Sequence, residues 1–221
     1  MIEFLNEHFY IMVAIYIMAF LVIVLLSRHF YLKKKGIFGQ ATLYTRLRKL
    51  YDEKDYPWIK EIILPLNDQQ YLFYDAIVFG DKHIYLIEMK NQKGEIVSDL
   101  LDDWYFIDGK MNQIIIPNAY YDLEVKTHIL NKLLRQHLNR YINVIVCNEE
   151  TTIKPPYDKN RIINVKQIES FIKFHEQKSN LKTISIKNIE NMGNFILSKN
   201  VSNWFIRRKE INKVKNQRIK K

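Results

Sequence analysis

Cysteine, zinc-site histidines and phosphate-binding loops are nearly or entirely missing from this sequence of 221 residues. The single cysteine, Cys147, excludes an internal disulfide and agrees with a reducing compartment. The six histidines are scattered, and none has metal-site spacing with Cys147, which argues against a zinc protein. The sequence also has no Gly-rich phosphate loop and no Gly-x-Ser-x-Gly motif, so the signatures of P-loop nucleotide hydrolases and serine hydrolases are absent.

Charged side chains are also missing from Phe9 to Leu26. A helix needs roughly 20 apolar residues to cross a bilayer, and this run with its flanks is long enough. A cleaved signal peptide would have a basic leading segment, whereas Glu3 and Glu7 stand here, and Ser27-Arg28-His29 is no cleavage site. A buried core helix would show a polar stripe. The sequence therefore predicts a retained transmembrane helix over residues 9–27.

The charges on either side of this run predict its orientation. Acidic residues precede it, and Arg28 and Lys33-Lys34-Lys35 follow it. Because cationic flanks resist translocation, residues 28–35 are expected to form a basic juxtamembrane segment on the cytoplasmic side. Residues 1–8 then form a short extracytoplasmic N-terminus. We expect a single-pass protein of the cell membrane whose C-terminal domain faces the cytoplasm.

The remaining chain alternates strand and helix patterns, which predicts a mixed α/β domain over residues 36–150 and an α/β extension over 151–200. Helical patterns are expected at 36–52, 117–138, 167–175 and 187–198. Strands are expected at 58–66, 71–79, 83–89, 104–107, 111–116, 143–147 and 161–165. Pro117 suits a first helical turn. We expect a turn at Asp108-Gly109-Lys110 and a loop over 151–160.

Acidic residues are scarce in the C-terminal tail, residues 201–221. From Lys199 to Lys221 the chain has nine basic residues and one acid, Glu210, which supplies +8 of a net charge of +10. The tail is either a solvated, fraying terminus or a polyanion-binding segment. Its weak amphipathic pattern favours nucleic acid over anionic lipid. The predicted nucleic-acid contacts are Arg207, Arg208, Lys209, Lys213 and Lys215.

The strongest chemical signal lies between Tyr71 and Lys90. If Asp81-Lys82 forms a two-residue hairpin loop, Asp75 falls opposite Glu88 on one face of an otherwise apolar ribbon, and Lys90 shares that face. Two unpaired carboxylates at this position would repel each other, and a divalent cation would resolve the repulsion. Hard oxygen ligands suit Mg²⁺, or Mn²⁺ as second choice. The alternative is an ordinary Glu-x-Lys ion pair on a strand.

These residues resemble the active-site core of the PD-(D/E)xK nucleases, and the region from Gly36 to about Cys147 resembles their nuclease-related domain (NERD) family. The matching motifs are Lys35-Gly36-Ile-Phe-Gly39-Gln40, Asp75, Glu88-Met-Lys90-Asn91 followed by Gly94, Trp104, the helix Asp122–Leu134 with His128, and the strand Val144–Cys147. The resemblance implies a restriction-endonuclease-like fold, with a mixed sheet core flanked by helices and preceded here by the transmembrane helix.

The resemblance also implies metal-dependent hydrolysis of phosphodiester bonds in DNA, or in RNA. Asp75 and Glu88 would hold Mg²⁺ or Mn²⁺, and Lys90 would orient the attacking water or stabilise the charged phosphate. Gln40 stands where the family usually has glutamate and would position the water. Two alternatives stay open. One is a weak or inactive module that tethers nucleic acid to the membrane, and the other is a membrane scaffold whose tail binds anionic lipid.

Overall fold

The computed structural model describes residues 2–217 apart from 35–36, 68–69, 92–93, 99–101, 108–110 and 155–160. On the helices, the side chains of 2–11, 29–34, 37–39, 54 and 214–217 also lie outside the description. The helices are α1 (Ile2–Lys34), α2 (Ile37–Lys54), α3 (Ala119–Leu134), α4 (Ile168–Lys178), α5 (Ile186–Lys199) and α6 (Trp204–Gln217). The strands are β1 (Trp58–Pro65), β2 (Tyr71–Phe79), β3 (Ile84–Lys90), β4 (Gly94–Val97), β5 (Trp104–Ile107), β6 (Gln113–Ile116), β7 (Tyr141–Cys147), β8 (Thr151–Lys154) and β9 (Ile162–Asn164).

The central sheet has five strands in the order β1-β2-β3-β7-β9. The first three strands pair antiparallel, whereas β7 and β9 join in parallel. Every residue of β3 is buried, as expected for a central strand covered on both faces. This mixed sheet flanked by helices confirms the predicted α/β class.

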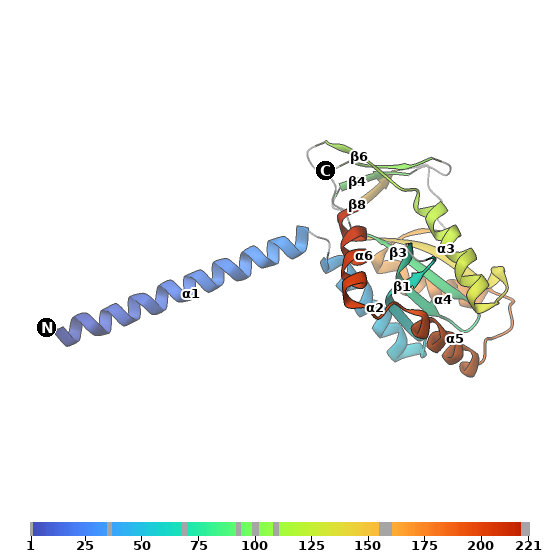
Figure 1. Cartoon of the computed structure of the whole chain (residues 1–221), viewed down its shortest axis with the longest axis horizontal. Helices are drawn as coiled ribbons and strands as arrows, with labels where there is room; N and C mark the ends of the chain where they lie inside the picture. The colour runs from blue at the N-terminus through green and yellow to red at the C-terminus, as the bar shows by residue number, and fades with distance from the viewer. Residues whose placement is uncertain are drawn as a thin grey trace.

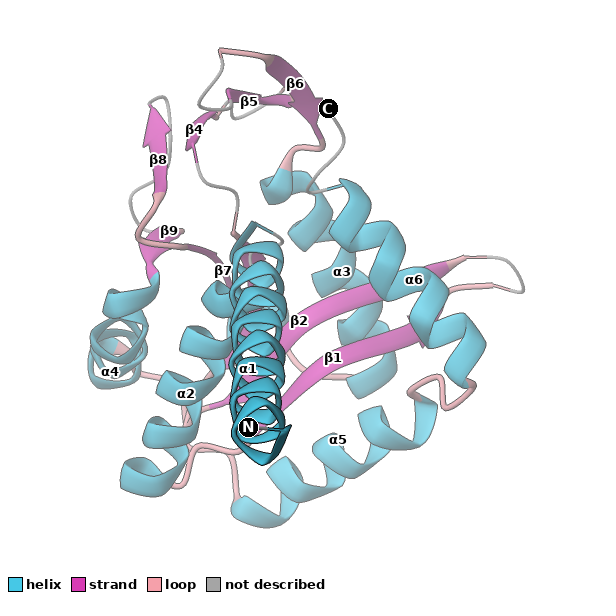
Figure 2. Cartoon of the chain, turned by 90° about the vertical axis from the view of Figure 1, so that its left-hand side faces the viewer, coloured by secondary structure: helices cyan, strands magenta, loops and turns pink. Residues whose placement is uncertain are grey.

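Two helical layers cover the sheet (Figure 2). One layer contains α2 and α4, whose leucines and isoleucines, among them Leu43, Leu47 and Ile172, form a buried cluster with the sheet residues Val78, Tyr85 and Ile87. The other layer contains α3 and α5, and its buried cluster joins residues of both helices to the opposite face of the sheet. Fully burying each aliphatic side chain of this kind contributes roughly 1.5–3 kcal/mol.

A second, four-stranded sheet in the order β6-β5-β4-β8 sits beyond the end of the central sheet (Figure 1). Trp104 of β5 is fully buried, and its ring meets that of Tyr120 on α3 edge to face, with 5.3 Å between centroids. Gly94 opens β4 with φ +147°, where a Cβ atom would collide with the carbonyl of Ile107. Only glycine fits this position without strain.

Several element predictions are corrected by the structure. Two strands were missed: β4, and β8 within the expected loop over 151–160, whose positions 155–160 lie outside the described residues. Helix α3 begins at Ala119 behind an Asn118 cap, so Pro117 precedes the helix. The expected turn at 108–110 lies outside the described residues. Cys147 is buried, as predicted, and burial raises the pKa of its thiol to about 12.

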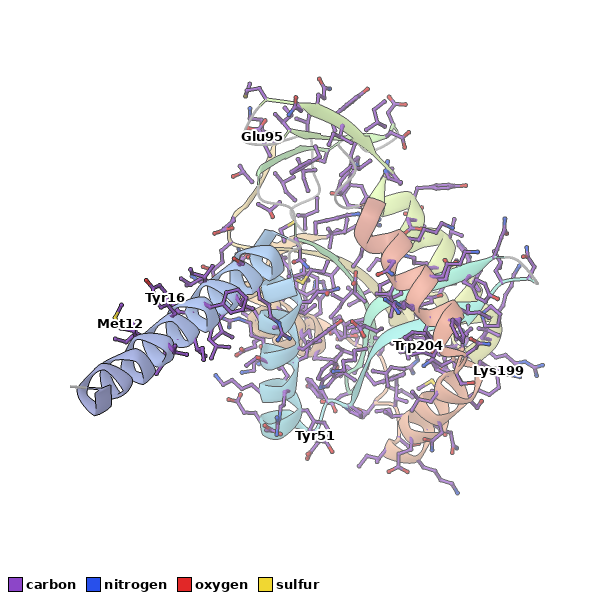
Figure 3. The ribbon with its side chains drawn as sticks, turned by 60° about the vertical axis from the view of Figure 1, so that its left-hand side comes forward. Met12, Tyr16, Tyr51, Glu95, Lys199 and Trp204 are labelled. Atoms are coloured by element: carbon purple, nitrogen blue, oxygen red, sulfur yellow. The ribbon has the colours of Figure 1, made fainter. Side chains whose placement is uncertain are left out.

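The N-terminal helix α1 projects away from the body of the molecule (Figure 1). Its large apolar side chains between Met12 and Leu26 are exposed, and Figure 3 shows Met12 and Tyr16 standing out from the helix. Within the described part of the chain, which on α1 includes the side chains of residues 12–28, no helix is both long and apolar enough to cross a membrane. The predicted transmembrane helix at 9–27 is not supported there, and the side chains of its residues 9–11 lie outside the description.

Candidate active site

The hairpin of β2 and β3 has the predicted register. Ala76 pairs with Ile87 and Phe79 with Ile84, and the amide of Gly80 donates to the carbonyl of His83. Continued by one position, this register places Asp75 opposite Glu88. The regular ladder stops at that point, because the amide of Met89 donates to the Asp75 carboxylate at 2.9 Å. The carboxylate thus takes the place of a backbone acceptor on β2.

The carboxylates of Asp75 and Glu88 do not stand together unpaired, as the sequence predicted, because each has its own partners. Asp75 Oδ1 accepts a hydrogen bond from Gln40 Nε2 on α2, at 3.2 Å. Glu88 contacts α3, where its Oε2 lies 3.2 Å from Lys126 Nζ, and the charge of Asp75 also acts on Lys126. Strand alternation is irregular beside Asp75: Tyr74 packs in the same cluster as Ile77, although regular pleating would place it on the other face.

Glu88 lies at the centre of a buried ionic cluster. Its Oε1 is 2.6 Å from Lys90 Nζ, and the Lys126 ammonium bridges Glu88 to Asp122, one turn earlier on α3. Glu88, Lys90 and Lys126 are all buried, whereas 42% of the Asp122 side chain is exposed. The predicted pair of unpaired, repelling carboxylates is therefore not what the fold contains, because Glu88 already has two cationic neighbours.

These contacts change the proton affinity of three groups. Burial raises the pKa of Glu88, but the ammonium groups of Lys126 and Lys90 outweigh burial and hold it well below its usual value. Burial and the neighbouring Glu88 raise the pKa of Asp122 to about 6. For Lys126, burial lowers the pKa, and the attraction of Glu88 and Asp122 raises it by more. Glu88 and Lys126 are thus charged at neutral pH.

Helix α3 is fixed so that Lys126 points at β3. The Asn118 side chain accepts from the amides of Tyr120 and Tyr121, at 2.9 and 3.3 Å, and so caps the helix. The hydroxyl of Tyr74 on β2 donates to the backbone carbonyl of Lys126 at 3.0 Å. Beside it, the Thr127 hydroxyl contacts the Asn143 side chain on β7 at 2.7 Å.

Sequence reasoning missed Lys126 and Asp122. The signal was present in the helical spacing, because Lys126 falls three residues after Leu123 and four before Leu130, in the buried stripe of α3. A lysine at such a position requires a buried acidic partner. The nearby acid Glu124 on the same helix is exposed and pairs with Arg161 at 3.2 Å.

The donor atoms suit Mg²⁺ in chemical type, since this ion is commonly held by one or two carboxylates together with water and substrate phosphate. Asp75 and Glu88 supply such oxygens at adjacent strand positions. Among the described residues, no three His, Cys, Asp or Glu side chains are grouped closely enough to hold a metal ion. A metal at this site would therefore rely on the two predicted carboxylates.

The basic tail is largely a folded helix, α6. Arg207 faces the protein, because its guanidinium donates to the Asn200 side chain and to the carbonyls of Val201 and Glu61, at 3.0–3.1 Å. Arg208, Lys209 and Lys213 are exposed, and the Arg208 guanidinium lies 5.0 Å from the centre of the Trp204 ring. The side chain of Lys215 lies outside the described residues.

Comparison with known proteins identifies the family of this chain. A family model described as nuclease-related domain (NERD) matches residues 35–148, just over half of the chain. The match includes Gln40, Asp75, Glu88, Lys90 and the helix that carries Lys126. No curated protein and no solved structure gives a match. On the family match, the chain belongs to the nuclease-related domain family.

Proposed function

We propose that this protein is a nuclease that hydrolyses phosphodiester bonds of DNA, or of RNA, with Mg²⁺ or Mn²⁺. The observation that carries the proposal is the buried pair Glu88–Lys90 on β3 beside Asp75 on β2, inside the region that matches the nuclease-related domain. Structural ion pairs rarely occupy a fully buried central strand, because their desolvation is costly. A catalytic requirement would explain their presence there.

Each residue has a distinct role in the proposed reaction. Asp75 and Glu88 would hold the metal ion, which supplies an activated water and neutralises charge on the phosphate. Lys90 would orient the water or stabilise the developing charge on the phosphate oxygens. Gln40 fixes Asp75 through its amide and would position the water. The burial of these groups strengthens their electrostatic effect on the substrate.

The test is cleavage of end-labelled DNA and RNA by the purified full-length chain, with Mg²⁺, with Mn²⁺ or with a chelator. Glu88→Gln and Asp75→Asn should lower the cleavage rate at least about a hundredfold. These amide substitutions are preferable to alanine, because Glu88→Ala would leave Lys90 and Lys126 as buried, unpaired cations.

The matched control is Glu95→Gln. Glu95, labelled in Figure 3, also lies on a strand and pairs with a lysine, Lys154, at 2.6 Å, but it belongs to the four-stranded sheet and not to the central sheet that carries the site. This variant should cleave at the wild-type rate. Cleavage that persists in the chelator, or that survives both site substitutions, would contradict the proposal.

Gln40 favours a second candidate function, a module that binds nucleic acid without cutting it. Its neutral amide satisfies Asp75 Oδ1 at 3.2 Å without any cation. Binding measured by fluorescence anisotropy, with no product under any metal condition, would favour this tether over the nuclease.

The exposed cations of α6 are proposed to contact the nucleic acid in either case. Arg208, Lys209 and Lys213 offer charges on one helix, and each neutralised phosphate adds about 0.9 to the slope of log affinity against log salt on B-DNA. A triple substitution to glutamine should flatten that slope by roughly two to three. An unchanged slope would exclude α6 from the interface.

We also propose that α1 anchors the domain to the cell membrane, with the C-terminal domain in the cytoplasm. Supporting this are the uncharged run from Phe9 to Leu26, the acidic and basic flanks, and the exposed apolar side chains of α1. Recovery of the full-length chain in the membrane fraction after a carbonate wash is expected. Release into the wash would contradict anchoring.

A further inference from the structure

The buried ammonium of Lys126 has no role in the reaction proposed above. Lys90 already neutralises Glu88 at 2.6 Å, and Lys126 adds a second cation at 3.2 Å on the other carboxylate oxygen. Desolvating an additional ammonium group is unfavourable unless the interactions with its partners compensate. The position of Lys126 between Glu88 and Asp122 therefore indicates a function other than stabilising the fold.

We propose that Lys126 is a positioning residue that competes with the divalent cation for the Glu88 carboxylate and so sets the metal affinity of the site. The inference rests on the proposed function in one respect, since it takes Glu88 as a metal-binding group. While Lys126 Nζ contacts Oε2, that oxygen is shared with a positive charge and is a weaker ligand for a second cation.

Asp122 is an alternative ion-pair partner for the Lys126 ammonium. It lies one turn earlier on α3, already contacts the same ammonium, and is far more exposed than Glu88, at 42% against 10% of the side chain. When a cation enters, the ammonium can turn towards Asp122 and keep a counter-ion. Only the Lys126 side chain would move, because hydrogen bonds of Tyr74 and Thr127 hold this part of α3 against the sheet.

The competition between Lys126 and the cation for Glu88 can be measured as a change in metal affinity. Replacing Lys126 by a neutral residue should strengthen Mn²⁺ binding roughly tenfold or more, because the competing charge near Glu88 is lost. Replacing Asp122 by asparagine should weaken Mn²⁺ binding, because Lys126 then keeps only one of its two salt-bridge partners, Glu88.

The experiment is isothermal titration calorimetry of Mn²⁺ into the purified full-length chain. Lys126→Met should bind at least about tenfold more tightly than wild type, and Lys126→Arg, which keeps the charge, should bind within about threefold of wild type. Far-ultraviolet circular dichroism checks that each variant is folded. If Lys126→Met does not fold, Lys126→Gln carries the same test, because its amide can still donate to Glu88.

A double variant separates the two roles of Asp122. In the Lys126→Met background, Asp122→Asn should leave the Mn²⁺ affinity unchanged if Asp122 acts only through Lys126. A further loss of affinity would make Asp122 a metal ligand and overturn its assignment as the partner of Lys126.

The inference and the proposed function can fail separately. If wild type cleaves DNA with Mg²⁺ but Lys126→Met binds Mn²⁺ no more tightly, competition by Lys126 is overturned and the nuclease stands. If Lys126→Met binds more tightly but no variant cleaves, the competition is supported and the nuclease activity is refuted. Equal tightening by Lys126→Met and Lys126→Arg would show a steric effect, and the electrostatic inference would be wrong.

Discussion

Replacing Gln40 by glutamate should make the fold depend on a divalent cation. In the structure the Gln40 amide donates to Asp75 Oδ1 at 3.2 Å, and both side chains are buried. The substitution restores the residue usual in the family and turns this hydrogen bond into a contact between two carboxylates. Asp75 keeps its bond from the Met89 amide, so it cannot easily turn away.

The magnitude follows from two contributions. Losing the hydrogen bond costs about 1 kcal/mol. Two like charges at this separation repel by about 5 kcal/mol at an effective dielectric constant of 20. One of the two carboxylates can instead take up a proton at pH 7, which limits the total loss of stability to about 4 kcal/mol. We therefore expect the metal-free variant to lose about 2–4 kcal/mol of unfolding free energy. For a protein of this size that lowers Tm by about 4–16 °C.

A bound cation should reverse most of this loss. At 100 times its dissociation constant, a ligand specific for the folded state contributes about 2.7 kcal/mol. The assay is thermal unfolding of wild type and Gln40→Glu at pH 7.5, in chelator and in excess Mg²⁺ or Mn²⁺. The expected result is a larger metal-dependent rise in Tm for the variant than for wild type.

Gln40→Met is the matched control, because it removes the hydrogen bond and adds no charge. It should lose about 1 kcal/mol with and without metal. If Gln40→Glu melts at the wild-type temperature in chelator, or gains no more from Mg²⁺ than Gln40→Met, then Asp75 and position 40 do not form part of a cation site.

Further predictions concern pH, the C-terminal helix and topology. Because the pKa of Asp122 is raised to about 6, the folded state binds its proton more tightly than the unfolded state, and the Asp122 contribution to stability should fall as pH rises from about 4 to 6. Solvent screening at the partly exposed side chain reduces the size of this effect. Urea unfolding of Asp122→Asn as a function of pH should lack it. Arg207→Ala should destabilise the fold by about 1–3 kcal/mol through lost hydrogen bonds to backbone and side chain, whereas Lys209→Ala should leave unfolding unchanged and weaken DNA binding. A reporter fused after Lys221 should be active only in the cytoplasm, and activity on the outer side would contradict the proposed orientation.

The sequence by itself determined the α/β class, most strands and helices, and the register of the β2–β3 hairpin. These follow from local rules. Alternating or continuous apolar runs predict strands, 3.6-residue spacing predicts helices, and the two-residue turn at Asp81-Lys82 sets which residues oppose each other. The same rules failed for β4 and β8, which are four residues each and gain their pairing from partners distant in sequence.

Only the tertiary structure decided how the charged groups meet. Asp75 and Glu88 are neighbours by register, but Asp75 contacts Gln40 while Glu88 meets Lys126. Lys126 lies 38 residues from Glu88 along the chain, and its position depends on how α3 packs over the sheet. Likewise Arg207 is one cation among the nine in residues 199–221, yet the fold gives it three acceptors, on Glu61 of β1, Asn200 and Val201. Local patterns determine the elements, whereas pairing between charges depends on the distances that packing creates.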